Sequence, residues 1–120
     1  IYASHPDHLA VGQSAIAAVY PDARNPFADP ELLTEEGLEP WTVTEVWTQG
    51  GPEIPERARV VVDITDTFDR KLAALRAHIS QTAHRADLEE MLRDWTGGNA
   101  RVAGLPEGRL AEMYRAIDTR

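Results

Sequence analysis

The chain has 120 residues, enough for one domain built around a modest hydrophobic core. Hydrophobic residues make up 42% and charged residues 27%, which is typical of a globular protein rather than a disordered one. A net charge of −8 argues against nucleic acid and against an anionic membrane surface as partners. The chain has no cysteine, so a metal would have to be held by histidine and carboxylate groups. No apolar run has the length of a membrane helix, and we expect a cytoplasmic protein.

A helix is predicted to begin within Ser4–Asp7. Ser4 or His5 can serve as the N-cap, Pro6 suits the first turn because its missing N–H has no partner there, and Asp7 favours the positive end of the helix dipole. Small and apolar residues then recur at helical spacing, which predicts a helix that faces a core and ends at Pro21. They are Leu9, Gly12, Ile16 and Val19.

A long proline-punctuated loop is expected from Pro21 to Pro40, with room for two helical turns around Glu31–Glu36. Thr42–Thr48 is rich in β-branched and aromatic residues and predicts a strand. Arg59–Thr65 predicts a second strand, and its three consecutive valines indicate a central strand buried on both faces.

Three further helices are expected after the second strand. Asp66 is predicted to cap the first, whose apolar stripe is Phe68, Leu72, Leu75 and Ile79. The second carries Leu88, Met91, Leu92 and Trp95 and is predicted to stop at Gly97-Gly98. The third carries Leu110, Met113, Tyr114 and Ile117. Four or five helices with two strands predict one α/β domain over 1–120, an incomplete layered fold whose other strands lie upstream.

The segment His5-Pro6-Asp7-His8 carries the most chemistry. Two histidines three residues apart on the first turn of a helix project from one face and can reach the same site. Asp7 can hydrogen-bond an imidazole nitrogen, and a catalytic zinc needs more ligands than the two or three available here. The alternative is structural: one histidine caps the helix and the other is partly exposed.

Other polar positions are weaker candidates, and most favour a structural interpretation. His78, Ser80 and Gln81 are expected to close a helix end, and His84 to be solvated. Arg24-Asn25-Pro26-Phe27 can contact a sugar, a neighbouring subunit or its own loop. Asp63 and Asp66 lie at a strand end where ligands bind in open α/β sheets, but a cap is the preferred role of Asp66. Trp41, Trp47 and Trp95 are expected in the core or at an interface.

These motifs occur together in an order that resembles one family. HPDH, a helix of small residues, ARNPF, EVW and DITDTFDRKLAALRAHISQ resemble the C-terminal part of the LmbE/PIG-L N-deacetylases, the group typified by N-acetylglucosaminyl-phosphatidylinositol de-N-acetylase. The resemblance runs from Tyr2 to about Gln81. It implies an LmbE-like, Rossmann-like three-layer α/β fold, of which this chain is the C-terminal portion.

The resemblance also implies a function and roles for individual residues. The family consists of zinc-dependent hydrolases (iron is an alternative metal) that remove an N-acetyl group from an amino-sugar conjugate. His8 matches a zinc ligand, His5 the histidine that stabilises the oxyanion and protonates the leaving amine, and Asp7 the carboxylate that orients His5. The family's second motif, A-H-P-D-D-E, does not occur in this sequence.

Without that segment we expect neither tight zinc binding nor catalysis from residues 1–120 alone. Association with the missing N-terminal half, or homo-oligomerisation, would cover an exposed sheet edge. The alternative function is a non-catalytic α/β interaction module that keeps the HPDH helix as a scaffold.

Overall fold

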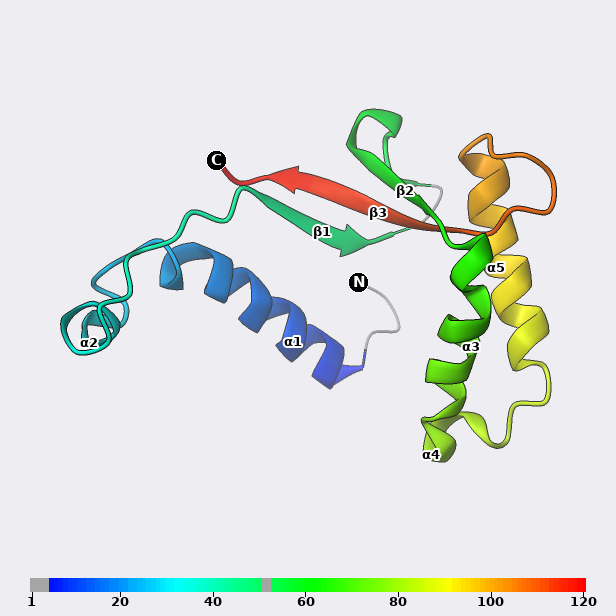
Figure 1. The fold of residues 1–120 in the computed structure, drawn as a ribbon, viewed down its shortest axis with the longest axis horizontal. Coiled ribbons are helices and arrows are strands. Elements are labelled where there is room, and N and C mark those ends of the chain that lie inside the picture. The colour runs from blue at the N-terminus through cyan, green and yellow to red at the C-terminus, as the bar shows by residue number, and fades with distance from the viewer. Residues whose placement is uncertain (1–4, 51–52) are drawn as a thin grey trace. The chain divides into compact units, whose positions relative to one another are not determined.

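The computed structural model describes residues 5–50 and 53–120. The chain forms two compact units (Figure 1). The first comprises Ile1–Val46 together with Asp118–Arg120, and the second comprises Trp47–Ile117. None of the described helices is long and apolar enough to cross a membrane.

The first unit contains α1, which spans Pro6–Ala17; it begins where the sequence predicts but ends four residues before Pro21, the predicted end. A π-helical turn, η1, follows over Ala18–Asp22 and is interrupted at Tyr20, whose backbone is extended (φ −155°, ψ 126°). The residue before a proline is disfavoured in the helical conformation, so Pro21 interrupts the helix at the preceding residue, Tyr20.

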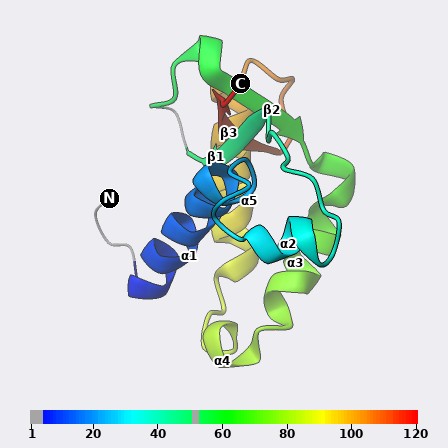
Figure 2. The ribbon, with the colours of Figure 1, turned by 90° about the vertical axis from the view of Figure 1, so that its left-hand side faces the viewer.

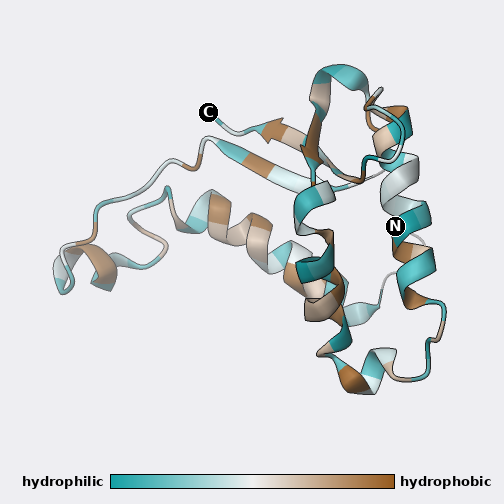
Figure 3. Ribbon diagram, turned by 45° about the vertical axis from the view of Figure 1, so that its right-hand side comes forward, coloured by the Kyte–Doolittle hydropathy of each residue, from teal (hydrophilic) through white to brown (hydrophobic). Residues whose placement is uncertain are grey.

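The predicted core face of α1 is not found in the described part of the chain. No residue of α1 is buried, and Leu9, Val11 and Ile16 expose 40%, 68% and 51% of their surface. Figure 3 colours the ribbon by hydropathy and shows several hydrophobic residues along this helix. The helical periodicity is therefore present, but the surface that would cover it is not among the described residues.

The segment after α1 is ordered by its own hydrogen bonds. A short helix, α2, spans Pro30–Thr34 beyond the C-terminal end of α1 (Figures 1 and 2). The Leu38 N–H donates to the Leu32 carbonyl at 2.9 Å, and the Trp41 N–H donates to the Ala23 carbonyl at 2.7 Å. The proline-rich stretch thus forms a fixed loop with one helical turn rather than two.

The sheet has three strands in the order β1-β3-β2, which are Glu45–Gln49, Ala111–Asp118 and Arg59–Asp63. The β2–β3 pair is antiparallel, with Arg59 opposite Arg115 and Asp63 opposite Ala111. Figure 1 shows β1 and β3 running in opposite directions as well. The described chain is therefore α/β with a three-stranded antiparallel sheet and five α-helices.

The sheet corrects two predictions. Residues 111–118 form strand β3, not a helix, because their burial alternates at the start of the strand and they pair with β2. The predicted central position of β2 is also wrong within the described residues, where β3 is the middle strand. Val62 of β2 is 37% exposed, so this strand is not buried on both faces.

The core of the second unit is formed by two helices together with Ile64, just after β2, and Leu110, just before β3. These helices are α3 (Phe68–Arg76) and α5 (Leu88–Val102), with the short α4 (Ile79–Thr82) between them in sequence. Two 3₁₀ turns, η2 (Glu56–Ala58) and η3 (Thr65–Thr67), flank β2. The buried apolar cluster consists of Ile64, Phe68, Leu72, Leu88, Leu92 and Leu110, with Leu75 and Met91 against it.

Two helix boundaries in the second unit differ from the predictions. Ile79 does not continue the stripe of α3, because that helix ends at Arg76 and Ile79 is 71% exposed. Gly97-Gly98 does not stop α5, which continues to Val102 and ends before Gly104, a residue at φ +74°. A glycine ends a helix when its backbone adopts the left-handed conformation, as Gly104 does. Gly97 and Gly98 lie within α5 and therefore do not end it.

Candidate functional site

The HPDH segment forms the start of α1, where His5 is the N-cap residue. Its extended backbone (φ −61°, ψ 145°) turns the chain into the helix, and Pro6 occupies the first helical position. The Nδ1 atom of His5 accepts a hydrogen bond from the Asp7 N–H at 3.2 Å. The capping role predicted for Ser4 or His5 is thus carried by His5, while Ser4 lies outside the described residues.

The carboxylate of Asp7 lies beside the same ring nitrogen. Its Oδ2 atom is 3.5 Å from Nδ1 of His5, a close charge contact, whereas the hydrogen bond comes from the Asp7 backbone. Because Nδ1 accepts that bond, the proton of a neutral His5 resides on Nε2. The ring can therefore donate from Nε2 when neutral and has a carboxylate next to Nδ1 when protonated.

His8 lies close to His5 on the first turn. The two ring centroids are 6.2 Å apart, with a tilt of 56° between the planes, and both residues are exposed. His5, Asp7 and His8 are therefore brought together on one exposed helix start, as the spacing predicts.

The donor set fits a metal only in part. Imidazole and carboxylate are the ligands that zinc takes in cysteine-free sites. Within the described residues, however, no group of three or more His, Asp or Glu side chains is placed to share an ion. His8 would need further ligands from outside these residues.

The loop motif lies away from the HPDH segment. Arg24-Asn25-Pro26-Phe27 follows the C-terminal end of α1, a helix of 12 residues and thus about 18 Å long. Nη2 of Arg24 donates to the Thr119 carbonyl at 2.8 Å, and the Phe27 N–H donates to Oδ1 of Asn25 at 3.0 Å. These contacts favour a structural role for the motif: Arg24 binds the C-terminal segment, and Asn25 stabilises the loop itself.

At the end of β2 it is Asp63, not Asp66, whose side chain binds the turn that follows. Oδ1 of Asp63 accepts hydrogen bonds from the N–H and the hydroxyl of Thr65, at 2.9 and 2.6 Å, and Arg109 pairs with Oδ2 at 3.3 Å. These Thr65 bonds, and then the charge of Arg109, hold the pKa of Asp63 below its ordinary value. The prediction of Asp66 as the helix cap is wrong, because Asp66 lies inside the turn η3 and the N-cap residue of α3 is Thr67.

His78, Ser80 and Gln81 do not close a helix end with their side chains. His78 precedes α4 and makes no capping hydrogen bond with its ring, and the side-chain amide of Gln81 donates to the hydroxyl of the neighbouring Ser80 at 3.4 Å. The backbone carbonyl of His78 accepts instead, from the hydroxyl of Thr82 at 3.0 Å. His84 is exposed, as expected.

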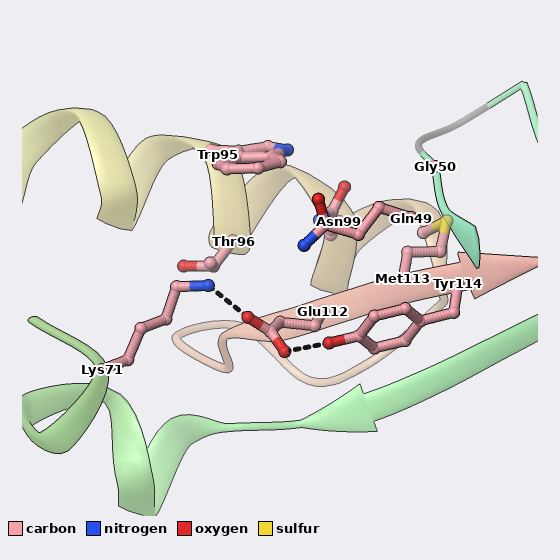
Figure 4. A pocket seen from close by; sticks show the side chains of 9 residues that line it. All are labelled: Gln49, Gly50, Lys71, Trp95, Thr96, Asn99, Glu112, Met113 and Tyr114. Atoms are coloured by element: carbon pink, nitrogen blue, oxygen red, sulfur yellow. Dashed lines mark hydrogen bonds and ion pairs between the residues drawn. The ribbon is translucent and has the colours of Figure 1, made fainter. Parts of the chain in front are cut away.

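The structure also shows a polar cluster in the second unit that the sequence analysis did not identify (Figure 4). The ammonium of Lys71 donates to Oε1 of Glu112, and the hydroxyl of Tyr114 donates to Oε2 of the same carboxylate. These bonds hold the pKa of Glu112 below its usual value, against the effect of burial, and raise the pKa of Tyr114 to about 12.

The cluster borders a small hollow between α3, α5 and β3. Its lining residues are Gln49, Gly50, Lys71, Trp95, Thr96, Asn99, Glu112, Met113 and Tyr114. Lys71 belongs to the DITDTFDRKLAALRAHISQ segment, whereas Glu112 and Tyr114 lie in a segment for which the sequence predicts a helix. In a helix, residues two apart point in different directions, whereas in a strand they share a face.

Two of the tryptophans expected in the core or at an interface are not core residues. Trp95 is 53% exposed and Trp47 is 49% exposed.

Comparison with known proteins found one informative similarity. The chain is 34% identical over 91 residues to a protein of Bacillus subtilis (strain 168) described as "Probable N-acetyl-alpha-D-glucosaminyl L-malate deacetylase 2". The chain is a partial homologue of this deacetylase. The alignment covers 75% of the chain but only 36% of the relative, so the chain spans about a third of that protein's length. No family model and no solved structure matches the chain.

Proposed function

We propose that this chain is the C-terminal part of a zinc-dependent N-deacetylase of the LmbE/PIG-L type, which hydrolyses the acetamide of an amino-sugar conjugate. The observation that carries the proposal is the 34% identity with a deacetylase, in a chain whose HPDH segment gathers two imidazoles and a carboxylate. The three-layer fold, the cytoplasmic location and the treatment of 1–120 as one portion of a larger domain belong to the same proposal.

In this proposal His8 is the ligand that the chain contributes to the metal. Bound zinc would polarise the acetyl carbonyl and lower the pKa of a water molecule. The remaining ligands, and the carboxylate that takes the proton from water, would come from outside the described residues.

His5 is the proton donor of the proposed reaction. Water adds to the acetyl carbon, the bond between that carbon and nitrogen breaks, and the amine leaves with a proton from His5 while acetate is released. Charge that develops on the carbonyl oxygen would be offset by the protonated ring, whose Nδ1 atom lies 3.5 Å from the Asp7 carboxylate.

Acetate release is the direct test. The protein expressed from its whole reading frame would be given N-acetyl-α-D-glucosaminyl L-malate, with His5→Ala, Asp7→Asn and the exposed His84→Ala as variants. We expect His5→Ala to lower kcat by about 10²-fold or more, since general acid catalysis is worth that much, and His84→Ala to match the unchanged protein.

The opposite outcome would favour the alternative function. If the unchanged protein releases no acetate from this or related N-acetylated sugars, or if His5→Ala retains full activity, the deacetylase proposal fails. The chain would then be an interaction module that retains the HPDH helix as a scaffold.

A further inference from the structure

We propose that the hollow between α3, α5 and β3 binds a neutral saccharide, with the sugar ring on Trp95 and one hydroxyl inserted toward Asn99 (Figure 4). The proposal is independent of the deacetylase proposal, because no residue of the HPDH segment lines this hollow. It rests on the charge, the hydrogen-bonding capacity and the exposure of the lining side chains.

The charged groups at the hollow, Lys71 and Glu112, are paired with each other. Glu112 receives hydrogen bonds on both carboxylate oxygens, from Lys71 on one side and from Tyr114 on the other. A cationic ligand would compete with Lys71, and an anionic ligand would approach a carboxylate. The site therefore favours a ligand without charge.

The hydrogen-bonding groups left for a ligand are amides. The Asn99 side chain is buried, with 4% exposure, and its Nδ2 donates to the Ala111 carbonyl at 3.3 Å. Among the described residues no donor reaches its Oδ1 atom, which is left as an acceptor. Gln49, at the exposed end of β1, adds an amide with both a donor and an acceptor. Sugar hydroxyls, which donate and accept, match this pair.

An aromatic surface lies beside these amides. Trp95 is 53% exposed, and the Lys71 ammonium lies 5.8 Å from its ring centroid, which fixes one position of the indole. Tyr114 is supported by Trp47, with ring centroids 5.7 Å apart. Large aromatic faces next to a few polar groups are typical of small-molecule sites, and the C–H face of a pyranose fits such a surface.

The volume of the hollow limits the size of the group that can enter it. Its volume is about 20 Å³, room for a water-sized group such as a single hydroxyl. The rest of the ring would lie outside, on Trp95. The proposed mode is thus one anchored hydroxyl and one stacked face, which predicts weak and saturable binding.

The test is a titration of the isotope-labelled protein, expressed from its whole reading frame, with N,N′-diacetylchitobiose, without metal, followed by nuclear magnetic resonance. The side-chain amide of Asn99 and the indole N–H of Trp95 should shift together and saturate. Trp95→Ala should weaken binding about tenfold, the equivalent of about 1.4 kcal/mol. Trp41→Ala is the matched control, because Trp41 is 72% exposed and lies in the other unit.

Three results would overturn the proposal: no shift at Asn99 and Trp95, unchanged affinity in a folded Trp95→Ala variant, or an equal loss in Trp41→Ala. Signal dispersion of each variant reports whether it is folded. Because the readout is binding without metal, its failure leaves the acetate-release test unaffected, and the reverse also holds.

Discussion

The ring of His5 combines a structural task with a proposed chemical one. Nδ1 caps α1 by accepting from the Asp7 N–H, and the Asp7 carboxylate lies 3.5 Å from the same atom. Loss of activity in an alanine variant would therefore mix loss of the cap with loss of the imidazole. A variant that keeps only the cap separates the two.

His5→Asn is that variant, because asparagine is among the best N-cap residues. We expect His5→Ala to lower the free energy of α1 opening by about 1 kcal/mol, and His5→Asn to lower it much less. Amide hydrogen exchange of α1 measures this directly. Both variants should lose acetate release in the full-length protein. Activity retained in His5→Asn would show that His5 is a cap and no more.

Tyr114 gives the polar cluster a dependence on alkaline pH. Its pKa is raised to about 12 by the hydrogen bond to Glu112, from an ordinary value near 10. A pKa that is higher in the folded state contributes stability below pH 10, and this contribution is lost as the pH rises toward 12. We expect the free energy of unfolding to fall more steeply in that window than it does in Tyr114→Phe, as measured by urea denaturation. Parallel curves for the two proteins would contradict this.

Helix α5 shows how a structure element ends. Its carbonyls are closed by hydrogen bonds from Gly104 N–H to Arg101 at 3.0 Å and from Leu105 N–H to Ala100 at 2.9 Å. This pattern is the Schellman motif, with Gly104 in the left-handed region at φ +74°. The two glycines inside the helix have no such geometry.

A pair of glycine substitutions tests this ending. No atom lies within 4 Å of a Cβ added at Gly104, so Gly104→Ala should destabilise by backbone strain alone, about 1 kcal/mol. Gly98→Ala should instead stabilise by about 1 kcal/mol, because Gly98 is helical and an added Cβ meets only Arg101 at 3.9 Å. Urea unfolding of both variants measures the difference in sign. A shift in the same direction for both would contradict the assigned ending.

The sequence predicts elements well where local signals agree, as at the start of α1 and in β2. It fails at β3, because Leu110, Met113, Tyr114 and Ile117 have helical spacing while the actual partner of this segment, β2, lies about fifty residues away in sequence. Pairing over that distance overrides the local periodicity. The end of α3 is missed for a related reason: Ile79 fits the stripe, yet the chain has already turned at His78 (φ −83°, ψ 64°).

At the scale of the whole molecule, the candidate site is predictable only where it is contiguous. His5, Asp7 and His8 are neighbours in sequence, so their grouping follows from helix geometry. The Lys71–Glu112 pair joins residues 41 positions apart and could not be found without the strand. The chain spans about a third of the deacetylase it resembles, and α1 leaves its apolar residues exposed within the described part.

Metal content is the most direct test of the central claim that His8 is a metal ligand of an N-deacetylase. The protein expressed from its whole reading frame would be purified without added metal and analysed for zinc and iron, beside His8→Ala and the matched control His84→Ala. We predict about one zinc per chain in the unchanged protein and in His84→Ala, and a loss of most of it in His8→Ala, since a zinc site relies on each of its few ligands. Metal retained in His8→Ala, or no bound metal in the unchanged protein, would contradict the account.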